Sequence, residues 1–302
     1  MRYLSPALLS AGLLAASTAI AAEPVVFTEA TLPHEFIRRA HTAISIDGKL
    51  DEFVWSAAPQ INTFHRVTVG QEFGDIPQVT RARMLWDDEA LYFAFTCRDT
   101  DIWAIYTDED DRMWSEEVVE VFIDPDSDGR DYLEFQVNPL NAHVDLHIIS
   151  LNPWDSSIEW DIDGVRNAVD VIGTVNDSSD TDVGWTAEIA IPWPAFLPQI
   201  TGGERPQVGD MWRLNLYRIE RGAGAGVRQQ IVDLRTRITV ARQQMESAAD
   251  TTVLARQVTA LQEELAPLAR RYALETDYTA WSPTLSSGFH NPSRFGIVEF
   301  AP

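Results

Sequence analysis

The 302-residue sequence contains one cysteine, Cys97, so an internal disulfide is impossible. Basic residues are scarce: 23 Lys and Arg stand against 46 Asp and Glu, which gives a formal net charge of -23. Such an acidic surface repels phosphate backbones and anionic lipids, and this argues against nucleic acid as a partner. It is compatible with neutral ligands and with hard cations.

Long hydrophobic runs are also missing beyond the first 22 residues, so no membrane span is expected. Residues 1–22 combine a positive start at Arg2, an apolar stretch over 7–20 and a small-x-small triplet at 19–21. This pattern is typical of a secretory signal peptide that is removed from the mature protein. We therefore expect an exported protein, either periplasmic or secreted.

Most of the remaining chain alternates or runs apolar in short segments bounded by Gly, Pro, Asn and Asp. About ten strands at this spacing predict an all-β fold, a two-sheet antiparallel β-sandwich of jelly-roll type. The expected strands are residues 43–46, 80–86, 91–98, 118–124, 132–138, 142–149, 165–172, 185–191, 211–219 and 294–300. Residues 50–58 predict a short helix, with Asp51 as its cap and Trp55 facing inward.

Residues 224–275 break the β pattern, because their apolar residues recur at three- and four-residue intervals in two runs separated by a turn at 247–250. This spacing predicts an antiparallel helical hairpin, with Pro267 kinking or ending the second helix. Strand signals resume afterwards, so the hairpin is an insertion in a sandwich formed by residues 23–223 and 276–302. It is interpreted either as an arm for a protein partner or self-association, or as a decoration that packs on itself.

Residues 114–149 carry the most informative alternation. On 118–124, Val119, Val121 and Ile123 are apolar, whereas Glu120 lies on the opposite face. Because strand side chains alternate between faces, the pattern predicts one core face and one polar face. The next two segments are divided in the same way, with Leu133, Phe135, Val137, Val144, Leu146 and Ile148 facing the core and Glu134, Gln136, Asn138, His143, Asp145 and His147 facing away.

The polar face is interpreted either as an ordinary solvated surface or as a sugar-binding surface. Its Glu, Gln, Asn and His side chains lie beside Trp114. Sugar rings stack on aromatic faces, and their hydroxyl groups need fixed donors and acceptors in place of lost water. This combination favours carbohydrate.

The connection 124–131 places carboxylates at Asp124, Asp126, Asp128 and Asp131 around a glycine. Alternate carboxylates of this kind wrap Ca²⁺ in flexible loops, although an acidic turn without metal remains open. The acidic cluster 108–111 is expected to be a solvated loop. His143, Asp145 and His147 lie on one face of the predicted strand and are a candidate ligand set for a transition metal, although three such ligands on one strand rarely suffice alone.

Catalytic motifs are missing from the sequence. It contains no Gly-x-Ser-x-Gly, no His-Glu-x-x-His and no glycine-rich phosphate loop. Carboxylates are abundant, so residue type alone leaves a glycoside hydrolase open, but no spacing distinguishes an acid from a nucleophile. The expectation is a protein that is not an enzyme.

Six segments in order resemble the family 9 carbohydrate-binding modules, which belong to the wider DOMON-like sandwiches. They are IDGKLDEFVW at 46–55, MLWDDEALYF at 84–93, WSEEVVEVFID at 114–124, FQVN at 135–138, GWTAEIAIPW at 184–193 and NPSRFG at 291–296. The resemblance implies a β-sandwich with bound Ca²⁺ that holds a poly- or oligosaccharide between two aromatic rings.

By motif position, the resemblance assigns Trp114 and Phe289 as the rings, and Glu120, Gln136 and Asn138 as the groups that bind hydroxyls. Gln136 stands where the best-known members have arginine, and Phe289 stands where they have tryptophan. Two other functions remain open. A DOMON-like haem or redox carrier would use axial ligands from Met84, Met113, His143 and His147, and a structural assembly subunit would act through the helical hairpin.

Overall fold

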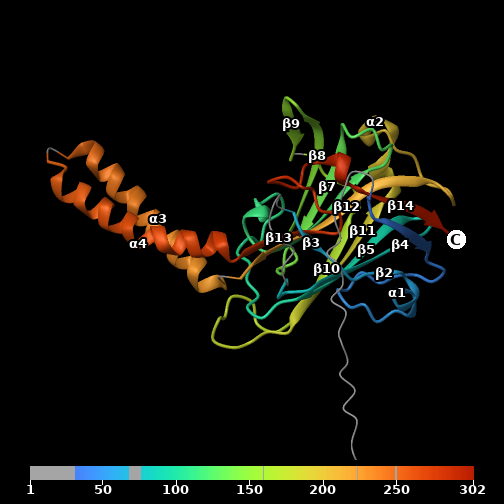
Figure 1. Ribbon diagram of the computed structural model, residues 1–302, viewed down its shortest axis with the longest axis horizontal. Coiled ribbons are helices and arrows are strands. Elements are labelled where there is room, and N and C mark those ends of the chain that lie inside the picture. Colours follow the sequence, from blue (N-terminus) through green and yellow to red (C-terminus); the bar gives the residue numbers. More distant parts are fainter. Residues whose placement is uncertain (1–30, 68–75, 159, 223, 249) are drawn as a thin grey trace, which may run out of the picture.

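A computed structural model describes residues 31–67, 76–158, 160–222, 224–248 and 250–302. The predicted signal peptide, residues 1–22, lies outside these ranges. A β-rich body contains most of the described chain, and two long helices project from one side of it (Figure 1). The predicted β-sandwich with an inserted helical hairpin is confirmed.

The strands form one hydrogen-bonded path whose two halves fold over a shared core. The first half contains β10 (Arg166–Ile172), β11 (Gly184–Pro192), β5 (Ala90–Arg98) and β4 (Thr80–Trp86). The second contains β14 (Gly296–Ala301), β12 (Met211–Arg221), β6 (Val118–Asp124), β7 (Tyr132–Val137), β8 (His143–Leu151) and β9 (Trp154–Ser157). Short strands β2 (Gln60–Ile61), β3 (His65–Arg66) and β13 (Thr276–Ala280) pair beside this path.

The first strand departs from the prediction. Strand β1 (His34–Arg39) links the two halves and runs parallel to both β14 and β4, so the sheet is not purely antiparallel. The predicted strand at 43–46 is irregular instead. Only Ile37 of this strand is fully buried, so the sequence of 34–39 needs little alternation of apolar and polar residues. No strand was therefore predicted there.

The predicted short helix is α1 (Phe53–Ala57), with Trp55 buried as expected. Its cap is Glu52 rather than Asp51, and no side chain caps its first turn. The other short helices are α2 (Pro198–Thr201) and the 3₁₀ turns Met113–Ser115, Trp193–Phe196 and Pro292–Arg294.

The main core lies between the two halves. It contains Val119, Val121 and Ile123 of β6 together with the predicted inward residues of β7, which confirms the alternation on these two strands. The first half contributes larger side chains, among them Phe93, Phe95 and Trp185. Burial of this many apolar side chains stabilises the body by removing their surface from water.

Strand β8 is inverted relative to the prediction. Gln136 pairs with Val144, and cross-strand partners share a face, so Val144, Leu146 and Ile148 lie on the same face as Glu120 and Gln136. These apolar residues belong to a second hydrophobic cluster on the outer face of β6, β7 and β12. The alternate residues turn toward the sandwich interior, where the ring of His143 stacks on Phe135 with centroids 5.3 Å apart.

Helices α3 (Gly224–Ser247) and α4 (Thr252–Leu274) form the projecting hairpin (Figure 1). The predicted seam is confirmed: Leu234, Ile238 and Leu261 are buried between the helices. Pro267 does not end α4, which continues to Leu274. Within the described residues, neither these helices nor any other combines the length and apolar character that crossing a membrane requires.

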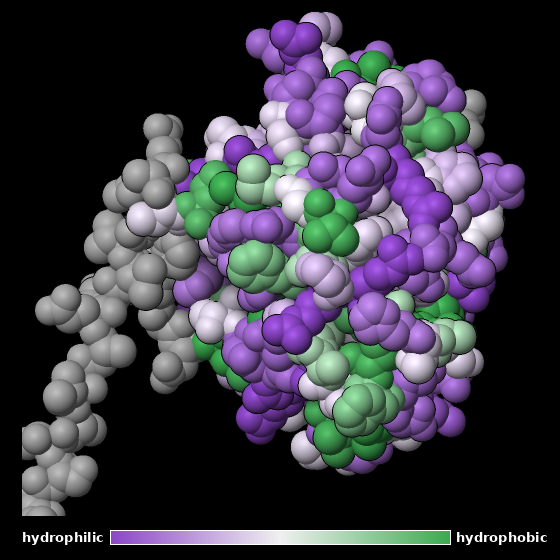
Figure 2. Space-filling model, turned by 90° about the vertical axis from the view of Figure 1, so that its right-hand side faces the viewer, coloured by the Kyte–Doolittle hydropathy of each residue, from purple (hydrophilic) through white to green (hydrophobic). Residues whose placement is uncertain are grey.

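The face of the body opposite the hairpin is mainly hydrophilic, with hydrophobic side chains in small groups (Figure 2). This distribution agrees with the acidic composition of the chain. The outer face of β6, β7 and β12 differs, because loops and β9 cover part of it and leave a hollow.

Candidate carbohydrate-binding site

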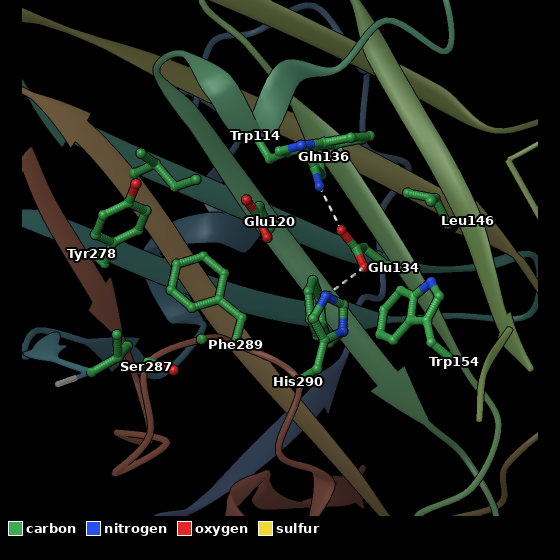
Figure 3. Close-up of a pocket in the computed structure, with 14 residues that line it drawn as sticks. Trp114, Glu120, Glu134, Gln136, Leu146, Trp154, Tyr278, Ser287, Phe289 and His290 are labelled. Atoms are coloured by element: carbon green, nitrogen blue, oxygen red, sulfur yellow. Dashed lines mark hydrogen bonds and ion pairs between the residues drawn. The ribbon is translucent and has the colours of Figure 1, made fainter. Parts of the chain in front are cut away.

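A pocket of about 450 Å³ opens on the outer face of the second half of the sandwich (Figure 3). Its floor is formed by β6, β7 and β12, and its walls come from the 3₁₀ turn Met113–Ser115, β9, β13 and the loop after β13. The residues that line it include Trp114, Glu120, Phe122, Glu134, Gln136, Leu146, Trp154, Ile219, Tyr278, Phe289 and His290. Four of the five predicted site residues, all except Asn138, therefore meet in one pocket.

Trp114 forms one wall of the pocket and is 38% exposed. Its position is set through the backbone, because Arg221 donates a hydrogen bond of 3.0 Å to the carbonyl oxygen of Trp114. The hydroxyl of Tyr272, near the base of the hairpin, donates to the carbonyl oxygen of the neighbouring Ser115. The indole is thus held at the rim with a face available to a ligand.

Phe289 lies across the pocket from Trp114 (Figure 3) and is more deeply set, at 8% exposure. Its ring stacks on Tyr217 of β12 with centroids 4.2 Å apart and an interplanar angle of 15°. The Tyr217 hydroxyl also donates to the carbonyl oxygen of Phe289 at 3.0 Å. These contacts fix the loop at the point where Phe289 lines the hollow.

The polar floor consists of Glu120 on β6 and of Glu134 and Gln136 on β7. Glu120 pairs across the strands with Gln136, and the Gln136 side-chain amide donates to Glu134 at 2.5 Å. All three side chains are buried, yet Oε1 of Glu120 and Oε1 of Gln136 have no hydrogen-bond partner in the described structure. A buried acceptor without a partner is unfavourable, so these atoms are suited to take a hydrogen bond from a ligand.

Burial raises the pKa of both carboxyl groups, because the charged form loses its hydration. Burial raises the pKa of Glu134 to about 7. The pKa of Glu120 is raised well above its usual range, first by burial and then by the nearby Glu134. The floor can therefore present a protonated carboxyl group as a donor or a carboxylate as an acceptor.

Sequence reasoning did not assign Trp154, Tyr278, Glu134 or His290 to the site. Trp154 of β9 is 53% exposed and meets His290 edge to face, with ring centroids 4.7 Å apart. His290 Nδ1 lies 2.7 Å from the Tyr132 hydroxyl, and burial lowers the pKa of His290 to about 4. Glu134 was placed on the correct face by alternation, whereas β9 was not predicted as a strand and β13 reaches the rim by pairing with β12 across the helical insertion.

Asn138 does not face the pocket. Its amide group donates to the carbonyl oxygen of Tyr106 and to Glu116, and its carbonyl oxygen accepts from the backbone of Leu140 and Ala142. The side chain is fully buried and these four bonds occupy it. Its position in this structure is therefore that of an organiser of the β7–β8 turn.

The acidic loop brings three of its four predicted metal ligands together. One oxygen each from Asp124, Asp126 and Asp128 lies within 4.8 Å of the others, whereas Asp131 lies 3.5 Å from His147. Oδ1 of Asp124 is buried without a partner, and burial raises the pKa of Asp124 to about 7. This oxygen-only set with an orphaned carboxylate oxygen fits a hard cation such as Ca²⁺.

The cluster 108–111, expected to be a solvated loop, is partly folded inward. Asp110 approaches Asp145 and Asp161 closely enough for the three to share an ion. The residues considered for haem are dispersed: Met84 lies in the main core and Met113 lies in the outer cluster.

Comparison with known proteins identifies the family. The profile described as "Carbohydrate family 9 binding domain-like" matches residues 46–301, which is most of the chain. The chain belongs to this family. The resemblance carried by the six sequence segments is thereby confirmed, and the pocket lies in a carbohydrate-binding domain of the family 9 type.

Two solved structures share the fold. A family 9 carbohydrate-binding module from Caldicellulosiruptor kristjanssonii, in complex with cellotriose, is 14% identical, with a TM-score of 0.51 over 89% of this chain and 93% of that one. A protein from Bacteroides uniformis ATCC 8492, whose description proposes carbohydrate binding, is 12% identical, with a TM-score of 0.55 over 89% and 100%. Among curated proteins, none matches the sequence significantly.

Proposed function

We propose that this protein is an exported, non-catalytic module that binds an oligo- or polysaccharide and is stabilised by Ca²⁺. The observation that carries the proposal is the pocket in which Trp114 and Phe289 flank a floor of Glu120 and Gln136. Aromatic walls accept the C–H faces of a sugar ring, and the unpartnered oxygens accept its hydroxyl groups. The similar module from C. kristjanssonii holds cellotriose, which supports a glycan as the ligand class.

The binding role needs no reacting group. Glu120 and Glu134 are neighbours on one sheet face, and both are assigned to hydrogen bonding with the sugar rather than to proton transfer. Asn138 supports the site from the β7–β8 turn. Under this proposal, catalytic turnover of the bound glycan is not expected.

Ca²⁺ would be held by Asp124, Asp126 and Asp128, at the β6–β7 connection and away from the aromatic walls. Bound there, it would neutralise the three carboxylates and fix the connection between the two strands that carry the polar floor. Asp131 is left out of this ligand set because its carboxylate is directed to His147.

A glycan array on the purified mature protein, repeated with and without EDTA, tests the proposal. We expect binding to a defined set of glycans that weakens after chelation. Trp114→Ala should lose the signal, whereas Phe53→Ala should keep it, because Phe53 is an aromatic residue 86% exposed on α1 outside the pocket. Unchanged binding by Trp114→Ala would reject the site.

The projecting hairpin supports a second role, as a contact for a protein partner or another copy of the chain. Its seam is buried between its own helices, and the rest of its surface extends away from the body (Figure 1). Light scattering on a variant that lacks residues 227–272 tests this role, since loss of an oligomer on deletion would support it.

A further inference from the structure

The acceptor-rich floor of the pocket points to a narrower ligand class. Glu120 and Glu134 lie on adjacent strands of one sheet face, and the nearby Glu134 contributes to raising the pKa of Glu120. The unpartnered buried atoms between the aromatic walls are both oxygens, Oε1 of Glu120 and Oε1 of Gln136. The Gln136 amide nitrogen is already bonded to Glu134, so with both carboxyl groups ionised this floor offers mainly acceptors.

Two basic side chains approach the pair: Arg221 acts electrostatically on Glu120 and lowers its pKa, and Nε2 of His290 lies 3.9 Å from a carboxylate oxygen of Glu134. Arg221 lies behind Trp114, and its guanidinium donates to Thr276, Tyr278 and the Trp114 carbonyl oxygen rather than to Glu120. Arg221 is also not among the residues that line the pocket. Since burial lowers the pKa of His290 to about 4, Glu134 is the acid of the pair that no charged basic side chain faces within the described residues, and a cation from the ligand would complement it.

The other titratable groups packed against the pair are neutral. Burial raises the pKa of Tyr132 and Tyr217 and lowers the pKa of His290 to about 4. Of these groups in the described structure, the two carboxyl groups and Arg221 are the ones that can carry charge at about pH 7.

The walls fit a cation as well. Trp114, Tyr278, Phe289 and Trp154 surround the floor (Figure 3), and the faces of such rings attract ammonium groups. An ammonium group has three hydrogen-bond donors and no acceptor, so it complements the acceptor oxygens of the floor. A neutral hydroxyl can bond to the same oxygens but leaves the carboxylate form of Glu134 without a cationic partner.

We propose that the preferred ligand of this pocket is an amino sugar with a free ammonium group, which lies between Glu120 and Glu134 while its ring stacks on Trp114 and Phe289. This inference rests on the proposed carbohydrate-binding function. Charge-assisted hydrogen bonds are about twice as strong as neutral ones, so we expect an affinity about tenfold higher for the amino sugar than for its hydroxyl analogue.

Titration calorimetry on the full mature chain provides the test, with oligomers of glucosamine, N-acetylglucosamine and glucose that have the same linkage and length. The glucosamine oligomer should bind about tenfold tighter than the other two. Its binding should also release protons at about pH 6, since the ammonium favours the carboxylate forms, and this appears as a dependence of the heat on the buffer.

Glu134→Gln should bring the affinity for the glucosamine oligomer down to that for the glucose oligomer measured on the same variant, and it should remove the proton release. Glu263→Gln, an exposed residue on α4, removes the same formal charge far from the pocket and should change neither. If the glucose oligomer binds as well as the glucosamine oligomer, the inference is wrong and the proposed function stands. If none of the oligomers binds, both are wrong.

Discussion

Replacement of Trp114 by alanine separates ligand binding from folding. Trp114 is 38% exposed, and a tryptophan buries about 200 Å² in full, so about 75 Å² of it is open to a ligand. At about 25 cal/mol per Å², covering this area with a sugar ring contributes about 2 kcal/mol. The variant should therefore bind its glycan about 25-fold more weakly.

The fold should tolerate this change. The contact that positions the turn uses the carbonyl oxygen of Trp114, which alanine retains. We expect the melting temperature to fall by less than about 2 °C, as for other exposed substitutions. Phe289→Ala should behave differently, because it removes a buried ring stacked on Tyr217 and costs about 3 kcal/mol of stability.

Titration calorimetry and thermal melts on the same preparations measure both effects. Phe53→Ala is the matched control, since it deletes an exposed aromatic ring outside the pocket. Affinity of Trp114→Ala within about twofold of the unmodified protein would mean that the indole does not contact the ligand.

Three further outcomes follow from the described contacts. The free energy of unfolding should fall as the pH rises from about 4.5 to about 7 in denaturant titrations, because Glu134 keeps its proton more tightly in the folded state, where its pKa is about 7. Ca²⁺ should raise the melting temperature at about pH 7, and Asp124→Asn should abolish that increase, since Asp124 supplies the orphaned oxygen. Ile238→Ala should open the α3–α4 seam at a cost of about 3 kcal/mol, seen as faster hydrogen exchange in the hairpin, while the sandwich keeps its protection; an unchanged exchange pattern would contradict this role of the seam.

The sequence predicted the interior of the sandwich well where one face of a strand is uniformly apolar. Val119, Val121 and Ile123 are such a set, and alternation placed them correctly. On β8 it failed, because Val144 and Leu146 serve a second hydrophobic cluster on the outer face. When both faces of a strand are buried, alternation shows that two faces differ but not which one meets the main core.

The site was predictable to the extent that its residues lie on neighbouring strands or within recognisable motifs. Trp114, Glu120 and Gln136 belong to one stretch of chain, and register brought them together. Tyr278 reaches the same pocket through the long-range pairing of β13 with β12, which no local pattern specifies, and Trp154 reaches it through a short β8–β9 hairpin that was not predicted. Asn138 had the right residue type, but its hydrogen bonds are taken by the backbone of the β7–β8 turn, by the Tyr106 carbonyl oxygen and by Glu116.

The hairpin has a mechanical consequence. A helix of 24 residues is about 36 Å long, so the far end of α3 stands roughly one small domain's diameter from the β-rich body. Segment 224–275 carries seven arginines and six acidic residues, and it is thus nearly neutral in a strongly acidic chain. A second molecule bound at that end of the hairpin would therefore experience little electrostatic repulsion from the acidic β-rich body. It would also leave the sugar pocket unobstructed. Two copies joined through that end could bind one polymer at two sites. The linkage would raise the overall avidity without any additional contact to the glycan.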